Sequence, residues 1–205
     1  MKKETLAKWD FGYQSCSSIL EKMELHVEQE VFTESVWMGE HPPIVTMGPR
    51  APRTSIFNPS LNITTVKRGG MATLHMPGQL MFYPLIDLKK HTLNIRQWID
   101  LLEQCVINTL KKYQIYALRC KGEPGVFAHQ GKIASIGIKI KNHRSYYGLC
   151  LNVLCNLGLF QDIIPCGLQN RPVASIYSAK HFIPINAVKQ QLFKEFTELL
   201  YNSDV

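Results

Sequence analysis

The class of fold follows from a strand-like stretch at positions 132–140, which reads KIASIGIKI. Apolar residues alternate along it with small or charged ones, which is the period of a β-strand that buries one face. The apolar parity holds Lys132, Ala134, Ile136, Ile138 and Ile140, and the other parity holds Ser135, Gly137 and Lys139. The alternation therefore predicts a half-buried strand that carries a lysine on its apolar face.

Further runs rich in β-branched and aromatic residues lie on either side of this strand, separated by Gly, Pro and Asn. They predict strands at residues 35–38, 44–47, 63–68, 82–88, 115–119 and 146–153. Three other segments carry apolar residues at three- and four-residue steps, which predicts amphipathic helices whose apolar stripes pack in the core. They extend from Tyr13 to Val27, from Ile95 to Val106 and from Val188 to Leu200, and Asn94 with Gln97 resembles a capping box before the second.

The predicted helices are too few and too far apart for regular alternation of strands and helices. We therefore predict an α+β fold, in which helices pack against a mixed β-sheet. The 205 residues fit a single catalytic domain. Its motif-bearing core spans about residues 36–177, and residues 178–205 form a C-terminal helical part.

The composition is that of an ordinary globular protein, with 45% hydrophobic and 19% charged residues. There are 23 Lys and Arg against 16 Asp and Glu, a net charge of +7 that favours acidic partners such as nucleic acid, a membrane surface or an acidic protein. The sequence contains no run of 18 apolar residues, so we predict no membrane span. No apolar segment follows the N-terminal basic residues, so we predict no signal peptide. Six cysteines without a C-x-x-C pair favour a reducing cytoplasm, and the seven histidines lack the spacing of a metal site.

Two residues are unusual for their positions. Cys166 lies between Pro165 and Gly167 at the end of an apolar run, where a turn can present a thiol or leave it half buried. A nucleophilic cysteine needs a group that promotes its thiolate, because little thiolate exists at neutral pH otherwise. Lys132, on the apolar parity of its strand, either extends to the strand's edge or is desolvated and ready for proton transfer.

A third feature is the segment KRGGMATLHMPGQ at residues 67–79. Paired glycines after an arginine allow backbone amides to face a ligand, and His75 with Gln79 adds polar groups near a second turn. The segment lacks the lysine and hydroxyl residue of a phosphate-binding loop. Taken alone, it also fits a hairpin loop with a surface histidine.

Read together, four blocks resemble the lipoyl(octanoyl) transferase family of protein lipoylation. Residues 40–48 resemble its E-H-x-P…T-x-G block, and residues 68–79 its R-G-G-x-x-T-x-H-x-P-G-Q signature. Residues 131–137 resemble its K-I-A-S-x-G block, residues 148–152 its G-x-x-L-N block, and residues 165–167 its nucleophile turn. The resemblance covers about residues 36–177, and it implies the fold shared by biotin and lipoate protein ligases.

The resemblance also implies an acyltransferase with a Cys/Lys dyad. Cys166 would be the nucleophile that carries an octanoyl group as a thioester, and Lys132 the residue that lowers its pKa. The implied substrate-binding residues form three groups along the chain: Arg68, Gly69, Gly70, Met71, Ala72, Thr73, Leu74 and His75; Ser135, Ile136 and Gly137; and Gly148, Leu149 and Cys150. No metal and no cofactor of its own is implied.

The implied partners are acyl carrier protein, whose phosphopantetheine arm carries the acyl group, and the lipoyl domains that receive it. The acceptors would be lipoyl domains of 2-oxoacid dehydrogenase complexes and the H protein of glycine cleavage. Both protein partners are acidic in this family, which would give the positive net charge a role in their encounter. Neither nucleic acid nor a membrane is implied as a partner.

Alternatives remain at this point. An ATP-dependent lipoate or biotin ligase shares the fold but needs no nucleophilic cysteine, and a cysteine hydrolase would use His75 as its base. A basic nucleic-acid-binding domain lacks any recognised module here. The sequence also departs from the family pattern at Met71, Leu74, Met76 and Tyr147, and Leu74 and Met76 are expected to flank His75 in the acyl pocket.

Overall fold

The computed structural model describes residues 6–164, 172–179 and 182–202. Its main element is a seven-stranded mixed sheet in the order β1-β2-β6-β10-β9-β8-β7. These strands span, in that order, Ala7–Tyr13, Ser35–Glu40, Gln79–Asp87, Arg144–Asn152, Gly131–Lys141, Glu123–Ala128 and Ala117–Cys120. A three-stranded sheet in the order β4-β3-β5 spans Ile63–Thr65, Ile44–Met47 and Ala72–His75.

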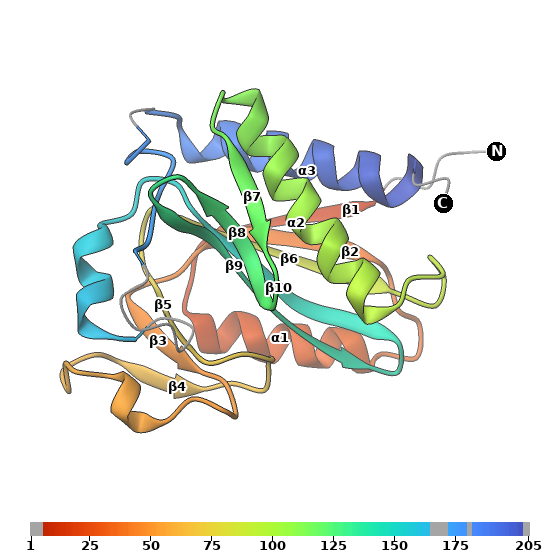
Figure 1. The fold of residues 1–205 in the computed structure, drawn as a ribbon. Helices are drawn as coiled ribbons and strands as arrows, with labels where there is room; N and C mark the ends of the chain where they lie inside the picture. The colour runs from red at the N-terminus through yellow and green to blue at the C-terminus, as the bar shows by residue number, and fades with distance from the viewer. Residues whose placement is uncertain (1–5, 165–171, 180–181, 203–205) are drawn as a thin grey trace.

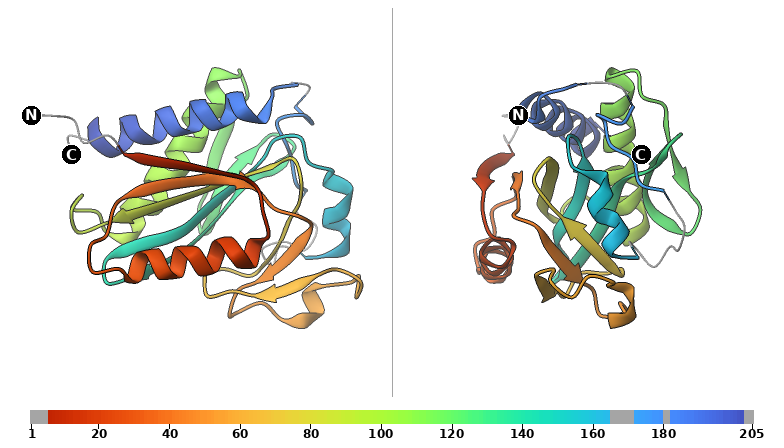
Figure 2. Two further views of the ribbon diagram at one scale, coloured as in Figure 1. Left: turned by 180° about the vertical axis from the view of Figure 1, so that it is seen from behind. Right: turned by 90° about the vertical axis from the view of Figure 1, so that its left-hand side faces the viewer.

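Three helices cover the two faces of the large sheet (Figures 1 and 2). One face packs against α1 (Cys16–Glu28), and the other against α2 (Ile95–Lys112) and α3 (Ile185–Asn202). The smaller sheet lies beside α1, at the lower left in Figure 1, with the short 3₁₀ helices η1 (Arg53–Ser55) and η2 (Leu157–Asp162) on the same side of the molecule. None of the helices in the described residues is long and apolar enough to cross a membrane.

The helix predictions are confirmed in position. Asn94 and Gln97 form a full capping box, in which each side chain accepts from the other's backbone N–H at 3.0 Å. In α3, Phe196 is fully buried and its ring meets the edges of Phe82 and Trp98, so the helix belongs to the main core. Tyr13 was expected in the first helix, but it ends β1 and is 58% exposed.

The strand predictions matched the structure at β3 and were close for most other strands. Three strands were not predicted, namely β1, β5 and β8. The first carries charged residues on its exposed positions, the second has only four residues, and the third contains Pro124 and Gly125, which are uncommon inside strands.

The strand β9 contains a bulge that changes the predicted direction of Lys132. Val126 of β8 pairs with Ala134, but the next residue, Phe127, pairs with Lys132, so Ile133 is the extra residue. Ile133 and Ala134 both join the core on the side of α2, and Lys132 faces a cavity on the side of α1. The prediction that Lys132 shares a face with Ala134 was therefore wrong, because a bulge interrupts the alternation of faces.

Candidate active site

A cavity of about 380 Å³ lies between the large sheet, the N-terminal part of α1 and the smaller sheet. Its size falls in the range of small-molecule sites. Most of the predicted site residues line it: Arg68, Gly69, Gly70, Met71, Thr73, His75, Lys132, Ser135, Ile136, Gly137, Gly148, Leu149 and Cys150. The fold thus gathers three groups of residues that are far apart in sequence around one space.

Three predicted residues are not in the cavity wall that the structure describes. Ala72 and Leu74 are fully buried in the core of the smaller sheet, where they alternate along β5 with Thr73 and His75, which do line the cavity. The third residue, Cys166, lies outside the described residues. Met76, also expected beside the acyl group, packs in the same small core as Leu74.

Several residues of the cavity wall were not predicted as binding residues. They include Cys16 and Leu20 of α1, Thr46 and Arg50 from the smaller sheet and the loop after it, Met81 and Tyr83 of β6, and Tyr147 of β10. Cys16 and Leu20 belong to an apolar stripe that we interpreted as core, since a cavity wall of this kind has the same sequence pattern as a core. Tyr83 lies four residues beyond the end of the signature block at residues 68–79.

Arg68 holds the glycine-rich loop against β3. Its Nη1 donates to the carbonyl oxygens of Gly69 and Met71, at 3.0 and 3.1 Å, and its Nη2 donates to the carbonyl and the Oγ1 of Thr46, at 3.0 and 2.8 Å. The side chain passes over Gly137, where an added Cβ would lie only 2.7 Å from Arg68 Cδ. A buried positive charge is thereby placed in the cavity wall with fixed hydrogen-bond acceptors.

His75 is a neutral imidazole in this wall. Its Nε2 lies 3.1 Å from Thr46 Oγ1, which already accepts a hydrogen bond from Arg68. We therefore assign the Thr46 hydroxyl as the donor and Nε2 as the acceptor. The proton of His75 is then on Nδ1, which has no hydrogen-bond partner among the described residues. Burial, and next the charge of Arg68, hold the pKa of His75 well below its usual value, so the ring stays neutral.

His41 has a different task. Its Nδ1 donates to the carbonyl of Gln14 at 2.7 Å, so its Nε2 accepts from the hydroxyl of Tyr83 at 3.0 Å. Burial lowers the pKa of His41 and raises that of Tyr83 well above its usual value. The pair is therefore neutral, and it orients Tyr83 where that residue lines the cavity.

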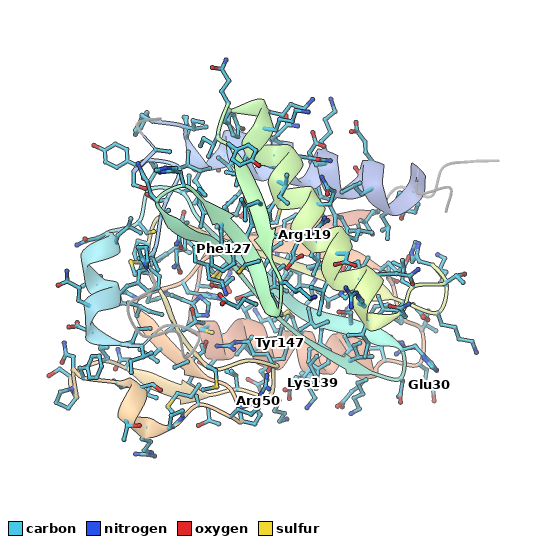
Figure 3. All side chains as sticks on the ribbon, viewed as in Figure 1. Glu30, Arg50, Arg119, Phe127, Lys139 and Tyr147 are labelled. Atoms are coloured by element: carbon cyan, nitrogen blue, oxygen red, sulfur yellow. The ribbon has the colours of Figure 1, made fainter. Side chains whose placement is uncertain are left out.

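Lys132 is a buried ammonium, with 7% of its surface exposed. Its Nζ donates to the carbonyl of Pro124 at 2.9 Å and lies 5.3 Å from the centre of the Phe127 ring, which is labelled in Figure 3. Both contacts suit a cation, since the carbonyl oxygen and the ring face are negative. The side chain is therefore held at the cavity wall.

The backbone of Lys132 also anchors the chain that follows the predicted nucleophile. Its N–H donates to Pro172 and its carbonyl accepts from Ala174, both at 2.9 Å. The carbonyl of Ala174 in turn accepts from Asn152 at 2.9 Å, and Gln79 donates to Asn152 at 2.8 Å. Two polar residues of the motif blocks thus fix this segment and do not line the cavity.

The chain that precedes the predicted nucleophile is fixed as well. The N–H of Ile164 donates to the carbonyl of Ser55 at 2.7 Å. Ile163 is buried in the core of the smaller sheet, and Val173 packs against the same cluster. The two described ends that flank Cys166 in sequence therefore meet at one hydrophobic cluster.

Cys16, in the cavity wall, and Cys155, in the core of the smaller sheet, are poor candidates for a nucleophile. Burial raises the pKa of the Cys16 thiol to about 12, and it raises that of Cys155 to about 12 as well. A thiol with such a pKa contains almost no thiolate at neutral pH. In the described part of the chain, no group of three or more His, Cys, Asp or Glu residues is arranged to hold a metal ion.

The two buried histidines predict a loss of stability in mild acid. Because the folded-state pKa values of His41 and His75 are lowered, the unfolded chain binds protons first as the pH falls below about 6.5. The free energy of unfolding should be steady above that pH and fall below it, by up to about 1.4 kcal/mol per pH unit for each histidine. Urea denaturation between pH 8 and pH 5.5 measures this slope.

His75→Gln is the matched variant, and it should flatten the slope below pH 6.5. Glu34, whose pKa is lowered, changes its protonation only at lower pH, and Glu103, whose pKa is raised by burial, changes stability in the opposite sense. An unchanged slope in His75→Gln would show that this histidine is already protonated in the folded protein.

Comparison with known proteins gives one family. Residues 19–197 match the family model described as the lipoyl protein ligase A/B catalytic domain. The chain is 39% identical over 159 residues to an octanoyltransferase of Shewanella halifaxensis, a match that covers 76% of this chain and 73% of that protein. It is 32% identical over 203 residues to an octanoyltransferase of Shewanella amazonensis, with 98% and 94% covered.

Solved structures agree on the fold. A bipartite lipoate protein ligase from Thermoplasma acidophilum superposes with a TM-score of 0.74 at 14% identity, covering 96% of this chain and 84% of that one. The biotin protein ligase from Aquifex aeolicus, in complex with biotin and ATP, has a TM-score of 0.62 at 15% identity, with 95% and 70% covered. The predicted fold, a mixed sheet with helices as in these ligases, is confirmed.

Proposed function

This chain belongs to the lipoyl protein ligase A/B catalytic-domain family, and from that premise we propose how it carries out octanoyl transfer in protein lipoylation. The donor is octanoyl-acyl carrier protein, and the acceptor is a lysine of a lipoyl domain. The acyl group passes through a thioester on Cys166, with Lys132 as the proton-transferring partner. The protein is an acyltransferase, and the donor, the intermediate and the dyad are the parts that we propose.

The observation that carries this proposal is the buried ammonium of Lys132 in the wall of a largely apolar cavity. The cavity suits a medium acyl chain, and Lys132 is tied through its backbone to the chain segment that follows Cys166. The other end of that segment is anchored at Ile164. The two anchors lie on either side of Cys166 in the sequence, which supports its proposed role as the partner of Lys132.

In the first step, the thiolate of Cys166 attacks the carbonyl carbon of the donor thioester. The new bond joins Cys166 Sγ to the acyl carbon, and the bond to the sulfur of the phosphopantetheine arm breaks. The ammonium of Lys132 stabilises the attacking thiolate and then gives its proton to the leaving sulfur. One thioester replaces another, so this step requires no ATP.

In the second step, the amine of the target lysine attacks the acyl group on Cys166. A carbon–nitrogen bond forms, the carbon–sulfur bond breaks, and neutral Lys132 takes the proton that the amine loses. The product is an amide, and Cys166 and Lys132 return to their starting thiolate–ammonium state. Lys132 is therefore charged at the start of the first step and neutral at the start of the second.

His75 and Arg68 supply the polar part of the wall. The neutral His75 fixes Thr46, whose Oγ1 lies 3.1 Å from His75 Nε2 and 2.8 Å from Arg68 Nη2. Arg50, labelled in Figure 3, lines the cavity from the loop after β3 and is exposed, so it is available to the phosphate of the donor's arm. The net charge of +7 acts in the same direction, toward acidic carriers.

A transfer assay tests the proposal. Octanoyl-acyl carrier protein and an apo lipoyl domain are mixed with the protein without ATP, and intact mass spectrometry of the lipoyl domain should show one added octanoyl group. A product that appears only with free octanoate and ATP would instead identify a ligase. Release of free octanoate without octanoylation of the lipoyl domain would identify a hydrolase.

A further inference from the structure

The geometry points to Glu103, on α2, as a positioning residue for Lys132 that acts through the peptide group between Pro124 and Gly125. This inference rests on the proposed function, because it assigns Glu103 a role through the proposed dyad lysine. Glu103 does not line the cavity, and no motif block contains it.

One peptide group joins the two side chains. Glu103 Oε1 accepts from the N–H of Gly125 at 2.8 Å, and Lys132 Nζ donates to the carbonyl of Pro124 at 2.9 Å. That N–H and that carbonyl belong to the same planar unit and point in opposite directions in a trans peptide. The structure contains no cis peptide among the residues it describes. A carboxylate and an ammonium therefore bind opposite sides of one rigid dipole.

This arrangement strengthens the hydrogen bond that Lys132 Nζ donates. A carboxylate draws the peptide N–H strongly, and a hydrogen bond of that kind polarises the carbonyl at the other side of the unit. The carbonyl of Pro124 is then a better acceptor for an ammonium than for a neutral amine. Glu103 thus acts on Lys132 without touching it, and it fixes the direction in which the carbonyl points.

Gly125 makes the close approach possible. Its φ of +129° is a conformation that other residues rarely adopt, and an added Cβ would lie 2.7 Å from Lys132 Cε and 3.2 Å from Lys132 Nζ. The lysine side chain therefore lies directly over the glycine. The bulge at Ile133 turns Lys132 toward this peptide group.

Glu103 is itself held by β7. Arg119, labelled in Figure 3 where β7 runs beside α2, places its Nε 3.1 Å from Glu103 Oε2. Arg119 also donates through Nη2 to the carbonyl of Asp100 and to Oε1 of Gln104, at 2.8 and 2.9 Å. Burial raises the pKa of Glu103, and Asp100 adds to that effect, while the Gly125 N–H and Arg119 oppose it.

A purely structural role is the alternative, in which Glu103 only fastens α2 to the hairpin of β7 and β8. Glu103→Gln separates the two roles, because the amide oxygen can still accept from Gly125 while the negative charge is gone. Glu103→Ala removes both. Asp100→Asn is the matched control, since it removes the same charge one turn earlier on the same helix without touching the Pro124–Gly125 peptide.

The experiment measures single-turnover acylation of the protein by octanoyl-acyl carrier protein from pH 6 to pH 10. For Glu103→Gln we expect a rate about tenfold below wild type and an alkaline limb of the rate profile displaced to lower pH, because the Pro124 carbonyl then holds the Lys132 ammonium less strongly. Its melting temperature should stay close to that of wild type. Asp100→Asn should keep the wild-type limb.

The inference is overturned if Glu103→Gln has the wild-type limb, or if its loss of rate simply follows a loss of folded protein. The rate of Cys166 alkylation by iodoacetamide against pH, with no donor present, gives an independent readout of thiolate formation. If the alkaline limb of alkylation is unchanged in Glu103→Gln but changed in Lys132→Met, the role of Glu103 is refuted and that of Lys132 is kept. If the wild-type protein forms no acyl-enzyme at all, the proposed thioester intermediate is refuted instead.

Discussion

Cys166→Ala should leave the protein folded and unable to form an acyl-enzyme, with a transfer rate at least about 10³-fold below that of wild type. One reason is that Cys16, in the cavity wall, and Cys155 do not have the properties of a nucleophile. Burial holds the pKa of Cys16 and Cys155 near 12, so their thiols stay protonated at neutral pH. Intact mass after incubation with octanoyl-acyl carrier protein is the measurement: wild type should gain one octanoyl group and the variant none.

Cys120→Ala is the control for this variant. Cys120 lies on β7, is partly exposed and is not in the cavity wall, so its removal should leave the adduct unchanged. An octanoyl adduct of undiminished mass and amount in Cys166→Ala would show that the acyl group is carried elsewhere. Peptide mapping would then identify the carrier residue.

The sequence predicted local features of the fold well. The capping box at Asn94 and the apolar stripe of α2 depend on neighbours three and four residues apart, so they can be read without knowing the tertiary structure. The first strand, β1, shows the opposite case. It is a parallel partner of β2, and the crossover through α1 that brings them together has no signature in the sequence of either strand.

The position of Lys132 shows what a pattern within one strand cannot predict. Counting alternate residues along β9 assigned Lys132 to the face of Ala134, but the bulge depends on how β8 pairs with β9. That pairing includes Gly125 and Phe127, which contact the lysine side chain. The sequence identified Lys132 as unusual, but the direction of its side chain could be determined only from the pairing of β9 with β8.

The cavity wall was predictable only where motifs marked it. Arg68 and His75 were found because they belong to a dense block of glycine and polar residues, whereas Thr46, which bonds to both, belongs to the motif block at residues 40–48 but was not predicted as a binding residue. Gln79 and Asn152 show that a motif residue can serve the fold of a site, since they support the segment at Ala174 and not the cavity. A motif therefore identifies residues of the site, and the structure shows which of them line the cavity and which hold neighbouring segments in place.

Lys132→Met should slow transfer by about 10² to 10⁴-fold, the usual contribution of a positioned acid–base group. Methionine has about the length of the lysine stem, and its thioether makes favourable contacts with an aromatic ring such as Phe127, so the strand and the bulge should persist. The loss follows because the same ammonium stabilises the Cys166 thiolate in the first step and, once neutral, accepts the amine proton in the second. Both half-reactions should therefore slow, unlike the effect of a variant that disturbs only one substrate.

Single-turnover measurements resolve the two half-reactions: the first with octanoyl-acyl carrier protein alone, the second by adding a lipoyl domain to acyl-enzyme isolated beforehand. Lys112→Met is the control, because Lys112 is exposed at the C-terminal end of α2, away from the cavity wall. A Lys132→Met protein within tenfold of wild type in both half-reactions would contradict the dyad. A defect confined to the second half-reaction would mean that Cys166 forms its thiolate without Lys132, and that the lysine serves only to deprotonate the acceptor amine.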